Sequence, residues 1–178
     1  MNAAAIWDLL RKASQGQDPW RIVSLCTWSF TGPQSRNVVL RQANAELNTL
    51  TFYTDKRSDK VSELQHDNRV SLLFWNAETK TQLRVNGQAT VLMDSDLTQA
   101  FWDQLPNHSK LEYAQTSRPG SHKDHQSSPL PVEQARNYFA VITVQAKHMD
   151  YLVLAREGHT RYRFDLKDKN WIKQELIP

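Results

Sequence analysis

The types and spacing of four residues suggest a ligand-binding site. They are the basic residues Arg36, Arg57 and Lys60 and the hydroxyl-bearing Ser58. Ser58 is a favourable N-cap residue, so the sequence predicts that a helix begins there. The N-terminus of a helix offers unpaired N–H groups and the positive end of the helix dipole. Together with the basic side chains, this pattern predicts an anion site, most simply a phosphate site. The alternative interpretation is a capped helix whose basic neighbours are only solvated.

Two predicted strands would position these residues. Residues 35–41 alternate, with Arg36, Val38 and Leu40 on one side of an extended chain and Asn37, Val39 and Arg41 on the other. Residues 42–48 are polar and indicate a turn, and residues 49–54 are rich in β-branched and aromatic residues. We therefore expect a hairpin that leads into a helix over residues 58–64.

The remaining pattern predicts one mainly β (α+β) domain over residues 1–178, with a few flanking helices. Further strands are expected at residues 20–28, 69–75, 81–92, 138–144, 149–154, 160–165 and 171–176, and helices at residues 3–13, 95–105 and 109–115. Asp94 is the expected cap of the second of these helices, and Gly87 is expected to mark a bulge. The polar, proline-containing segment 116–131 reads as a surface loop of the kind that often borders a site.

Three motifs occur in the order found in a known family. They are S-R-N-V-V-L-R at residues 35–41, F-Y-T-D-K-R-S-D-K at residues 52–60 and T-Q-L-R-V-N-G at residues 81–87. Over residues 20–87 the chain resembles the pyridoxamine 5'-phosphate oxidase-like family of FMN-binding split barrels, in particular small bacterial relatives whose phosphate turn reads D-x-R-S-x-K. The resemblance implies an antiparallel split β-barrel, FMN as cofactor, and a homodimer with FMN at the subunit interface.

The resemblance also implies a set of flavin-binding residues. They are Arg36, Asn37, Val38, Val39, Arg41, Tyr53, Thr54, Arg57, Ser58, Lys60, Gln82 and Arg161. The basic residues and Ser58 would bind the phosphate, the backbone of residues 37–40 would meet the ring edge, and Arg41 would face the substrate side. Gln82 would reach the flavin, although taken alone it could be an exposed strand residue. Arg161, with Arg163 as the alternative, would reach the flavin across the dimer, as would Gln126 and Ser127 in a segment similar to the family's H-Q-S-S.

The implied function is FMN-dependent oxidoreduction of an unidentified small molecule. A non-catalytic FMN- or haem-binding module remains an alternative, and so does a nucleic-acid-binding barrel, although a net charge of +3 is only mildly basic. With one cysteine no intrachain disulfide can form, and no apolar run approaches the roughly 18 residues of a membrane span, so a cytoplasmic location is expected. His108, His122 and His125 suggest a metal site, but their loop context favours solvated side chains and no metal is expected.

Residues of the predicted mid-chain helix indicate which substrates the protein can bind. True pyridoxamine 5'-phosphate oxidases hold the substrate phosphate with a Tyr, an Arg and a Ser at four-residue intervals, and this chain has Phe101, Leu105 and Ser109 at the positions we assign. Two of the three polar contacts would be missing. The sequence therefore predicts negligible activity on pyridoxamine or pyridoxine 5'-phosphate.

Overall fold

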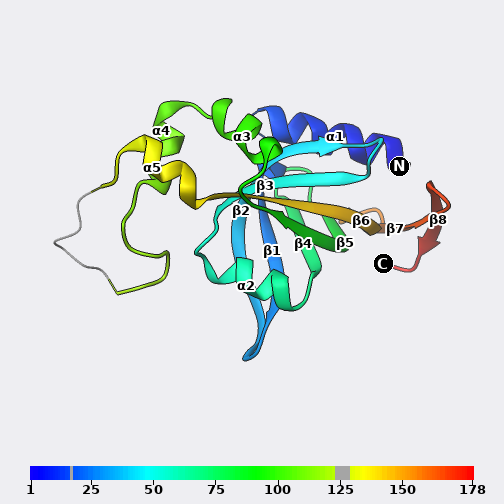
Figure 1. The fold of residues 1–178 in the computed structure, drawn as a ribbon. Coiled ribbons are helices and arrows are strands. Elements are labelled where there is room, and N and C mark those ends of the chain that lie inside the picture. Colours follow the sequence, from blue (N-terminus) through cyan, green and yellow to red (C-terminus); the bar gives the residue numbers. More distant parts are fainter. Residues whose placement is uncertain (17, 123–128) are drawn as a thin grey trace.

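An antiparallel β-barrel forms the body of the protein in the computed structural model, which describes residues 1–16, 18–122 and 129–178 (Figure 1). The strands are β1 (Ile22–Ser29), β2 (Gly32–Asn44), β3 (Thr49–Asp55), β4 (Arg69–Asn76), β5 (Thr81–Leu92), β6 (Phe139–Val153), β7 (Thr160–Lys167) and β8 (Asn170–Leu176). Six strands follow the order β3-β2-β1-β4-β5-β6, and pairing of β6 with β3 closes the barrel. Strands β7 and β8 extend the sheet from β6. The predicted mainly β split barrel is confirmed.

Helices flank the barrel. They are α1 (Ala3–Gln15), α2 (Asp59–His66), α3 (Asp96–Asp103), α4 (Asn107–Lys110) and α5 (Val132–Ala135), with short 3-10 helices at Pro19–Arg21, Leu111–Tyr113 and Arg136–Tyr138. Asn2 caps α1 by accepting a 2.8 Å hydrogen bond from the Ala5 amide, and the apolar face of α1 covers the barrel with Ile6 and Leu10 fully buried. Among the described residues, no helix has the length and apolarity needed to cross a membrane.

The barrel interior follows the alternation of the strands. In β4, Val70, Leu72 and Phe74 are buried, whereas Leu73 and Trp75 point outward and remain 39% and 44% exposed. In β5 the register shifts at Gly87, where an added Cβ would lie 2.2 Å from the Gln145 carbonyl oxygen. The predicted bulge is therefore confirmed, and close approach of β6 explains the glycine.

A smaller apolar cluster joins the helical segments to the start of β6. Its buried members are Trp102, Leu105, Tyr113, Ala114, Ala135, Phe139 and Val141. The sequence predicts Leu97, Ala100, Phe101 and Leu105 as the apolar face of this helix, and this is wrong in part. Leu97 is 52% exposed, and α3 buries Thr98 and Trp102. The expected cap is also wrong: Ser95 caps α3 through a reciprocal hydrogen-bond pair with Thr98, and Asp94 precedes it with a φ of 50°.

Several strand boundaries differ from the sequence expectation, and β2 is longer than residues 35–41 at both ends. Strand β1 begins at Ile22 because Pro19 opens a 3-10 turn, in which the Asp18 carboxylate accepts from the Trp20 amide at 2.8 Å. The two strands expected between residues 138 and 154 are one long strand, β6. Its first half pairs with β3 and β5, and its second half pairs with β5 and β7, so both halves stay extended.

Candidate functional site

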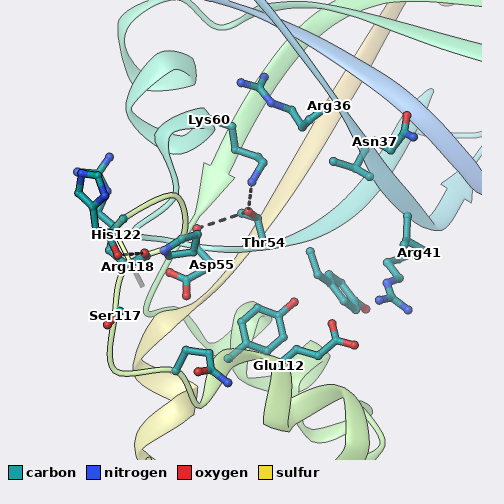
Figure 2. A pocket seen from close by; sticks show the side chains of 17 residues that line it. Arg36, Asn37, Arg41, Thr54, Asp55, Lys60, Glu112, Ser117, Arg118 and His122 are labelled. Atoms are coloured by element: carbon teal, nitrogen blue, oxygen red, sulfur yellow. Dashed lines mark hydrogen bonds between the residues drawn. The ribbon is translucent and has the colours of Figure 1, made fainter. Parts of the chain in front are cut away.

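A cavity of about 750 Å³ lies where β2, β3, the start of α2 and the segment after α4 meet (Figure 2). Of the predicted flavin-binding residues, those that line it are Arg36, Asn37, Val38, Val39, Arg41, Tyr53, Thr54 and Lys60. Adjacent strands β2 and β3 carry the first seven, and α2 carries Lys60. The cavity volume falls within the range of about 300–1,000 Å³ that is usual for small-molecule and cofactor sites.

One end of the cavity is cationic. The Lys60 ammonium donates to Thr54 Oγ1 at 3.1 Å and to Ser58 Oγ at 3.0 Å, so its described partners are neutral hydroxyl groups. Burial lowers the pKa of Lys60 below its usual value, and the positive charge of Arg36 lowers it further. An anion placed here would relieve this repulsion, so the geometry suits a phosphate group.

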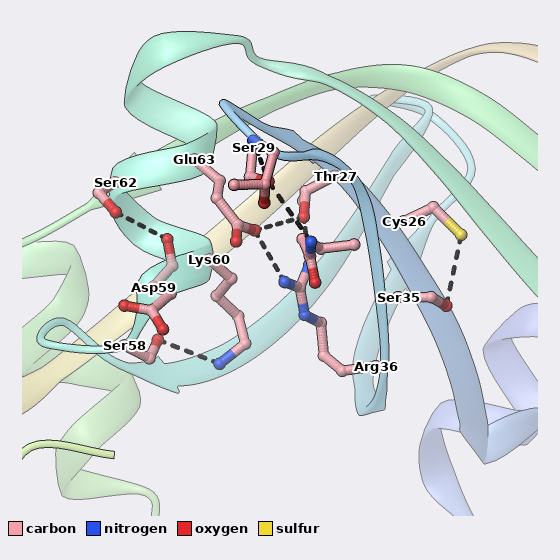
Figure 3. Close-up of polar contacts among 12 residues, drawn as sticks. Cys26, Thr27, Ser29, Ser35, Arg36, Ser58, Asp59, Lys60, Ser62 and Glu63 are labelled. Atoms are coloured by element: carbon pink, nitrogen blue, oxygen red, sulfur yellow. Dashed lines mark hydrogen bonds and ion pairs between the residues drawn. The ribbon is translucent and has the colours of Figure 1, made fainter. Parts of the chain in front are cut away.

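Arg36 is held beside Lys60 by contacts from outside the cavity (Figure 3). Its guanidinium donates to Glu63 Oε2 at 2.7 Å and to the Thr27 hydroxyl. Thr27 in turn donates to Glu63 at 2.6 Å, and the side chain of Glu63 is only 9% exposed. This network fixes the direction of Arg36 before any ligand arrives.

Ser58 occupies the predicted N-cap position, and α2 begins at Asp59. Its hydroxyl accepts no capping hydrogen bond from the backbone amides at the start of α2. Instead it donates to the Asp55 carbonyl at 2.8 Å and accepts from Lys60. The predicted N-cap position is therefore confirmed, although its side chain bonds elsewhere. Ser58 is buried and supports Lys60 from behind, outside the cavity lining.

Arg57 also lies outside the cavity lining. Its guanidinium makes a two-pronged ion pair with Asp55, donates to the backbone carbonyls of Gln115 and Thr116, and stacks 3.5 Å from the centre of the Tyr138 ring. These contacts direct the guanidinium away from Lys60. The structure does not bring Arg57 to the cationic end, where the sequence places it.

The other end of the cavity is built around Arg41. Its guanidinium lies 5.3 Å from the centre of the Tyr53 ring. Within the described residues, the buried Nε of Arg41 has no hydrogen-bond partner. An unsatisfied buried donor costs free energy, so this position suits a ligand that brings an acceptor. The neighbouring Tyr113 is buried, and burial raises the pKa of its phenol, which stays protonated as a donor.

The outer wall of the cavity contains residues that the sequence interpretation did not assign. They are Asp55, Glu112, Tyr113, Gln115, Ser117, Arg118, Pro119, Ser121 and His122. Phe101, Leu105 and Ser109 are absent from the lining, so the assignment of the substrate side to these positions is wrong. The reason is that α3 ends at Asp103 and Leu105 packs into the smaller apolar cluster. A Tyr, an Arg and a Ser do occur at similar spacing in Tyr113, Arg118 and Ser121. The order of these three residues, in a segment expected to border a site, is the sequence feature that could have identified this wall.

Gln82 and Arg161 lie on the outer face of the sheet and do not line the cavity. Gln82 pairs across the sheet with Trp75 and Leu152, and Leu152 pairs with Arg161. Arg161 makes a 2.8 Å ion pair with Asp150. The structure thus places these two residues on neighbouring parts of the sheet, with Leu152 of β6 between them, and separates both from the cavity. The alternative residue, Arg163, donates to Asp165 at 2.9 Å on the same sheet, and Gln126 and Ser127 lie outside the described residues.

The histidines do not form a metal site among residues 1–16, 18–122 and 129–178, where no group of three or more metal-binding side chains occurs. His122 lines the cavity, and His125 lies outside the described residues.

Comparisons with known proteins identify relatives of this chain. Pyridoxine/pyridoxamine 5'-phosphate oxidase 2 of Hydrogenovibrio crunogenus is 25% identical over 166 residues, which cover 82% of this chain and 73% of that protein. The pyridoxine/pyridoxamine 5'-phosphate oxidase of a Cyanothece species is 34% identical over 80 residues, but the match spans only 44% of this chain and 37% of that protein.

Solved structures show the same fold. A pyridoxamine 5'-phosphate oxidase-related, FMN-binding protein from Nostoc punctiforme superposes with a TM-score of 0.82 at 23% identity, covering 99% of this chain and 97% of that one. PhzG from Burkholderia lata, in complex with tetrahydrophenazine-1-carboxylic acid, superposes with a TM-score of 0.69 at 18% identity, covering 98% and 90%.

The family model described as "Pyridoxamine 5'-phosphate oxidase, FMN-binding domain" matches residues 4–93, just over half of the chain. The match includes α1, the first five strands and α2, and hence both Arg36 and Lys60. FMN is accordingly the cofactor. The chain belongs to the pyridoxamine 5'-phosphate oxidase family and carries its FMN-binding domain.

Proposed function

We propose that this protein is an FMN-dependent oxidoreductase whose substrate is a small anion, and that residues 1–178 act as one FMN-binding domain. The observation that carries the proposal is a single cavity with cationic side chains at both ends. Arg36 and Lys60 lie at one end, and Arg41, with a buried donor unpaired among the described residues, lies at the other. FMN, when bound, supplies hydride or electron transfer through its ring, so the protein contributes binding, orientation and electrostatics.

The cationic end fits the phosphate of FMN. A phosphomonoester carries close to two negative charges at neutral pH, and Lys60 supplies the positive charge that Glu63 does not offset, with Arg36 beside it. The Thr54 hydroxyl, already bonded to Lys60, lines the same end and can bond a phosphate oxygen. These residues suit a terminal phosphate, and the sequence has no Gly-rich loop for a pyrophosphate, so we propose FMN rather than FAD.

The middle of the cavity suits the rest of the cofactor. Asn37, Val38 and Val39 line it, and the side chain of Tyr53 lies between Arg41 and Phe139. A strand backbone presents N–H and C=O groups at a regular rise, which is what the polar edge of a flavin ring requires. These residues would orient the ring between the two charged ends.

The end near Arg41 would bind the anionic group of the substrate. The protonated phenol of Tyr113 lines this end, and Ser117 and Arg118 continue the wall on the opposite side of the cavity, beside Asp55 (Figure 2). Because this wall replaces the positions on the mid-chain helix, the expectation of negligible activity on pyridoxamine 5'-phosphate loses its basis. The curated relatives are named for phosphorylated substrates, and PhzG was solved with a carboxylic acid. We therefore propose a substrate that carries a phosphate or carboxylate.

A homodimer would complete the site. The outer face of the barrel exposes Ile22, Leu73 and Trp75, and Ile22 pairs with Val39, which lines the cavity. An apolar face of this kind usually marks an interface. Gln82 pairs with Trp75 on the same face, so a second subunit seated there could present its own Gln82 and Arg161 to the flavin.

The proposal is tested in two steps. The purified protein should absorb at about 450 nm as a flavoprotein, and the released cofactor should run with FMN on chromatography. Turnover of pyridoxamine 5'-phosphate, followed as hydrogen peroxide released, should exceed turnover of pyridoxamine, which lacks the anion. A haem spectrum or released FAD would contradict the cofactor assignment. Equal turnover of the two amines would contradict an anionic substrate, and bound FMN with no turnover of any phosphate or carboxylate substrate would favour a non-catalytic module.

A further inference from the structure

Arg57 does not line the cavity, but two of the residues that it contacts, Asp55 and Gln115, do. Its Nε and Nη2 atoms donate to the two carboxylate oxygens of Asp55 at 3.0 and 2.7 Å. The remaining contacts run to the carbonyl of Gln115 at 2.9 Å and that of Thr116 at 3.1 Å. The side chains of Arg57 and Asp55 are only 17% and 11% exposed, so this ion pair is screened less by solvent than a surface pair. One guanidinium thus joins the end of β3 to the segment after α4.

That segment, residues 115–122, is the outer wall of the cavity and has no helix or strand of its own. A second side-chain tie to the barrel comes from Arg118, which pairs with Asp59 at the start of α2. Both of those side chains are more than half exposed, and exposed pairs of this kind contribute little. The buried contacts of Arg57 are therefore the stronger attachment.

We propose that Arg57 is a positioning residue: it fixes the cavity wall at residues 115–122 from outside, and so determines how the cavity holds its substrate without touching the FMN phosphate. This inference rests on the proposed function. It also replaces the phosphate-binding role that the sequence suggests for Arg57.

An arginine is required by this geometry. Its planar fork can bond both oxygens of Asp55 while Nη donors remain for the two carbonyls. The flat guanidinium also lies on the Tyr138 ring, with Cζ 3.5 Å from the ring centre. A lysine has one nitrogen at the end of a flexible stem and cannot make the paired contacts and the stacking at once.

The wall and the side chains at the cationic end should respond separately to substitution. Lys60 and Arg36 are held by Thr54, Ser58 and Glu63, which do not belong to the wall. Ser117 and Arg118 belong to the wall and depend on its position. Loss of Arg57 should therefore disturb the wall and leave the direct contacts of Lys60 and Arg36 in place.

The experiment compares Arg57→Ala, Arg57→Lys and Lys60→Ala in the full-length, FMN-loaded protein. Hydrogen exchange of the amides of residues 114–122 should rise about tenfold or more in both Arg57 variants, because the lost contacts are charge-assisted hydrogen bonds. The dissociation constant for FMN should change less than about threefold in them. Lys60→Ala should do the reverse, with weaker FMN binding and unchanged exchange of the wall.

Binding of pyridoxal 5'-phosphate, used as an anionic probe, supplies the third measurement. It should weaken about tenfold in both Arg57 variants, with lysine failing to rescue the alanine effect. Loss of FMN affinity in Arg57→Ala to the same extent as in Lys60→Ala would overturn the inference and return Arg57 to the phosphate site. Unchanged wall exchange in Arg57→Lys would also overturn it, and this variant decides the matter if Arg57→Ala does not fold.

Failure of the proposed function would look different. Wild-type protein that binds no FMN would contradict the flavin assignment. The effect of Arg57 on wall exchange could still be measured in that protein and would decide whether Arg57 holds the wall.

Discussion

Replacing Lys60 with alanine tests the cationic end of the cavity most directly. Its ammonium is partly buried, donates to Thr54 and Ser58, and lies beside Arg36. The substitution removes one of the two positive charges at this end and leaves the Arg36–Glu63 pair intact. The remaining site would then carry little net charge, because Glu63 offsets Arg36.

The magnitude follows from the kind of contact that is lost. A hydrogen bond to a charged group contributes about 1.5–3 kcal/mol, so Lys60→Ala should weaken FMN binding by roughly 10- to 150-fold. Salt should reduce the difference between wild type and variant, since Lys60 is only partly buried and a charge pair there is partly screened. The fold should be little affected, because Lys60 makes no contact in the apolar core that a smaller side chain would empty.

The pKa of Lys60 adds a pH dependence. Burial and Arg36 lower this pKa, whereas bound phosphate favours the charged form. FMN affinity should therefore be full below the lowered pKa and should fall as the pH rises through it, earlier than for an ordinary lysine. Lys60→Arg keeps its charge at all accessible pH values, so the alkaline loss of affinity should move to higher pH in that variant.

The assay is a titration of apoprotein with FMN followed by the quenching of flavin fluorescence. Lys56→Ala is the matched control, because Lys56 lies in the same turn but pairs with Asp94 at 3.1 Å and does not line the cavity. It should bind FMN as the wild type does. Equal affinities for Lys60→Ala and Lys56→Ala, or an alkaline limb that Lys60→Arg leaves in place, would refute the reasoning.

Three further predictions concern the fold and assembly. Gly87→Ala should lower the unfolding free energy by about 1–3 kcal/mol in denaturant titrations, because its Cβ would meet the Gln145 carbonyl at 2.2 Å, whereas Gly16→Ala, with its nearest atom at 3.9 Å, should not. Phe139→Ala should cost about 3–5 kcal/mol in the same assay, since the fully buried ring stacks on Tyr53 and Trp102; a loss below about 1 kcal/mol would contradict that packing. Trp75→Glu should yield monomers in sedimentation experiments where the wild type is a dimer, while Leu97→Glu on α3 should remain dimeric; a wild-type monomer that binds FMN would exclude the interface.

Local pattern determined the strands and their faces. Period-two alternation at residues 35–41 predicted which side chains share one face of the strand, and that depends only on backbone geometry. The same pattern put Asn37, Val39 and Arg41 on one face, and all three line the cavity. Motif order was enough to identify the family, because the three motifs lie within the part that the family model matches.

Tertiary structure decided what the charged side chains do. Arg57 and Lys60 look equivalent in sequence, three residues apart in one basic turn. Asp55, two carbonyls of the wall and the Tyr138 ring draw Arg57 away, whereas Lys60 points into the cavity. Long, flexible side chains take the direction of their best partners, and for Arg57 most of those partners are about 60–80 residues away along the chain.

Packing also decided which residues line the proposed substrate side of the cavity. The apolar face expected on the mid-chain helix is wrong because Trp102 packs against Phe139 and Tyr113. This packing turns the helix so that Leu97 faces solvent. Periodicity gives the spacing of a helical face but not which of two apolar faces is buried. That choice depends on the volume left by β6 and the segment after α4. The same packing places Tyr113, instead of Phe101, at the cavity.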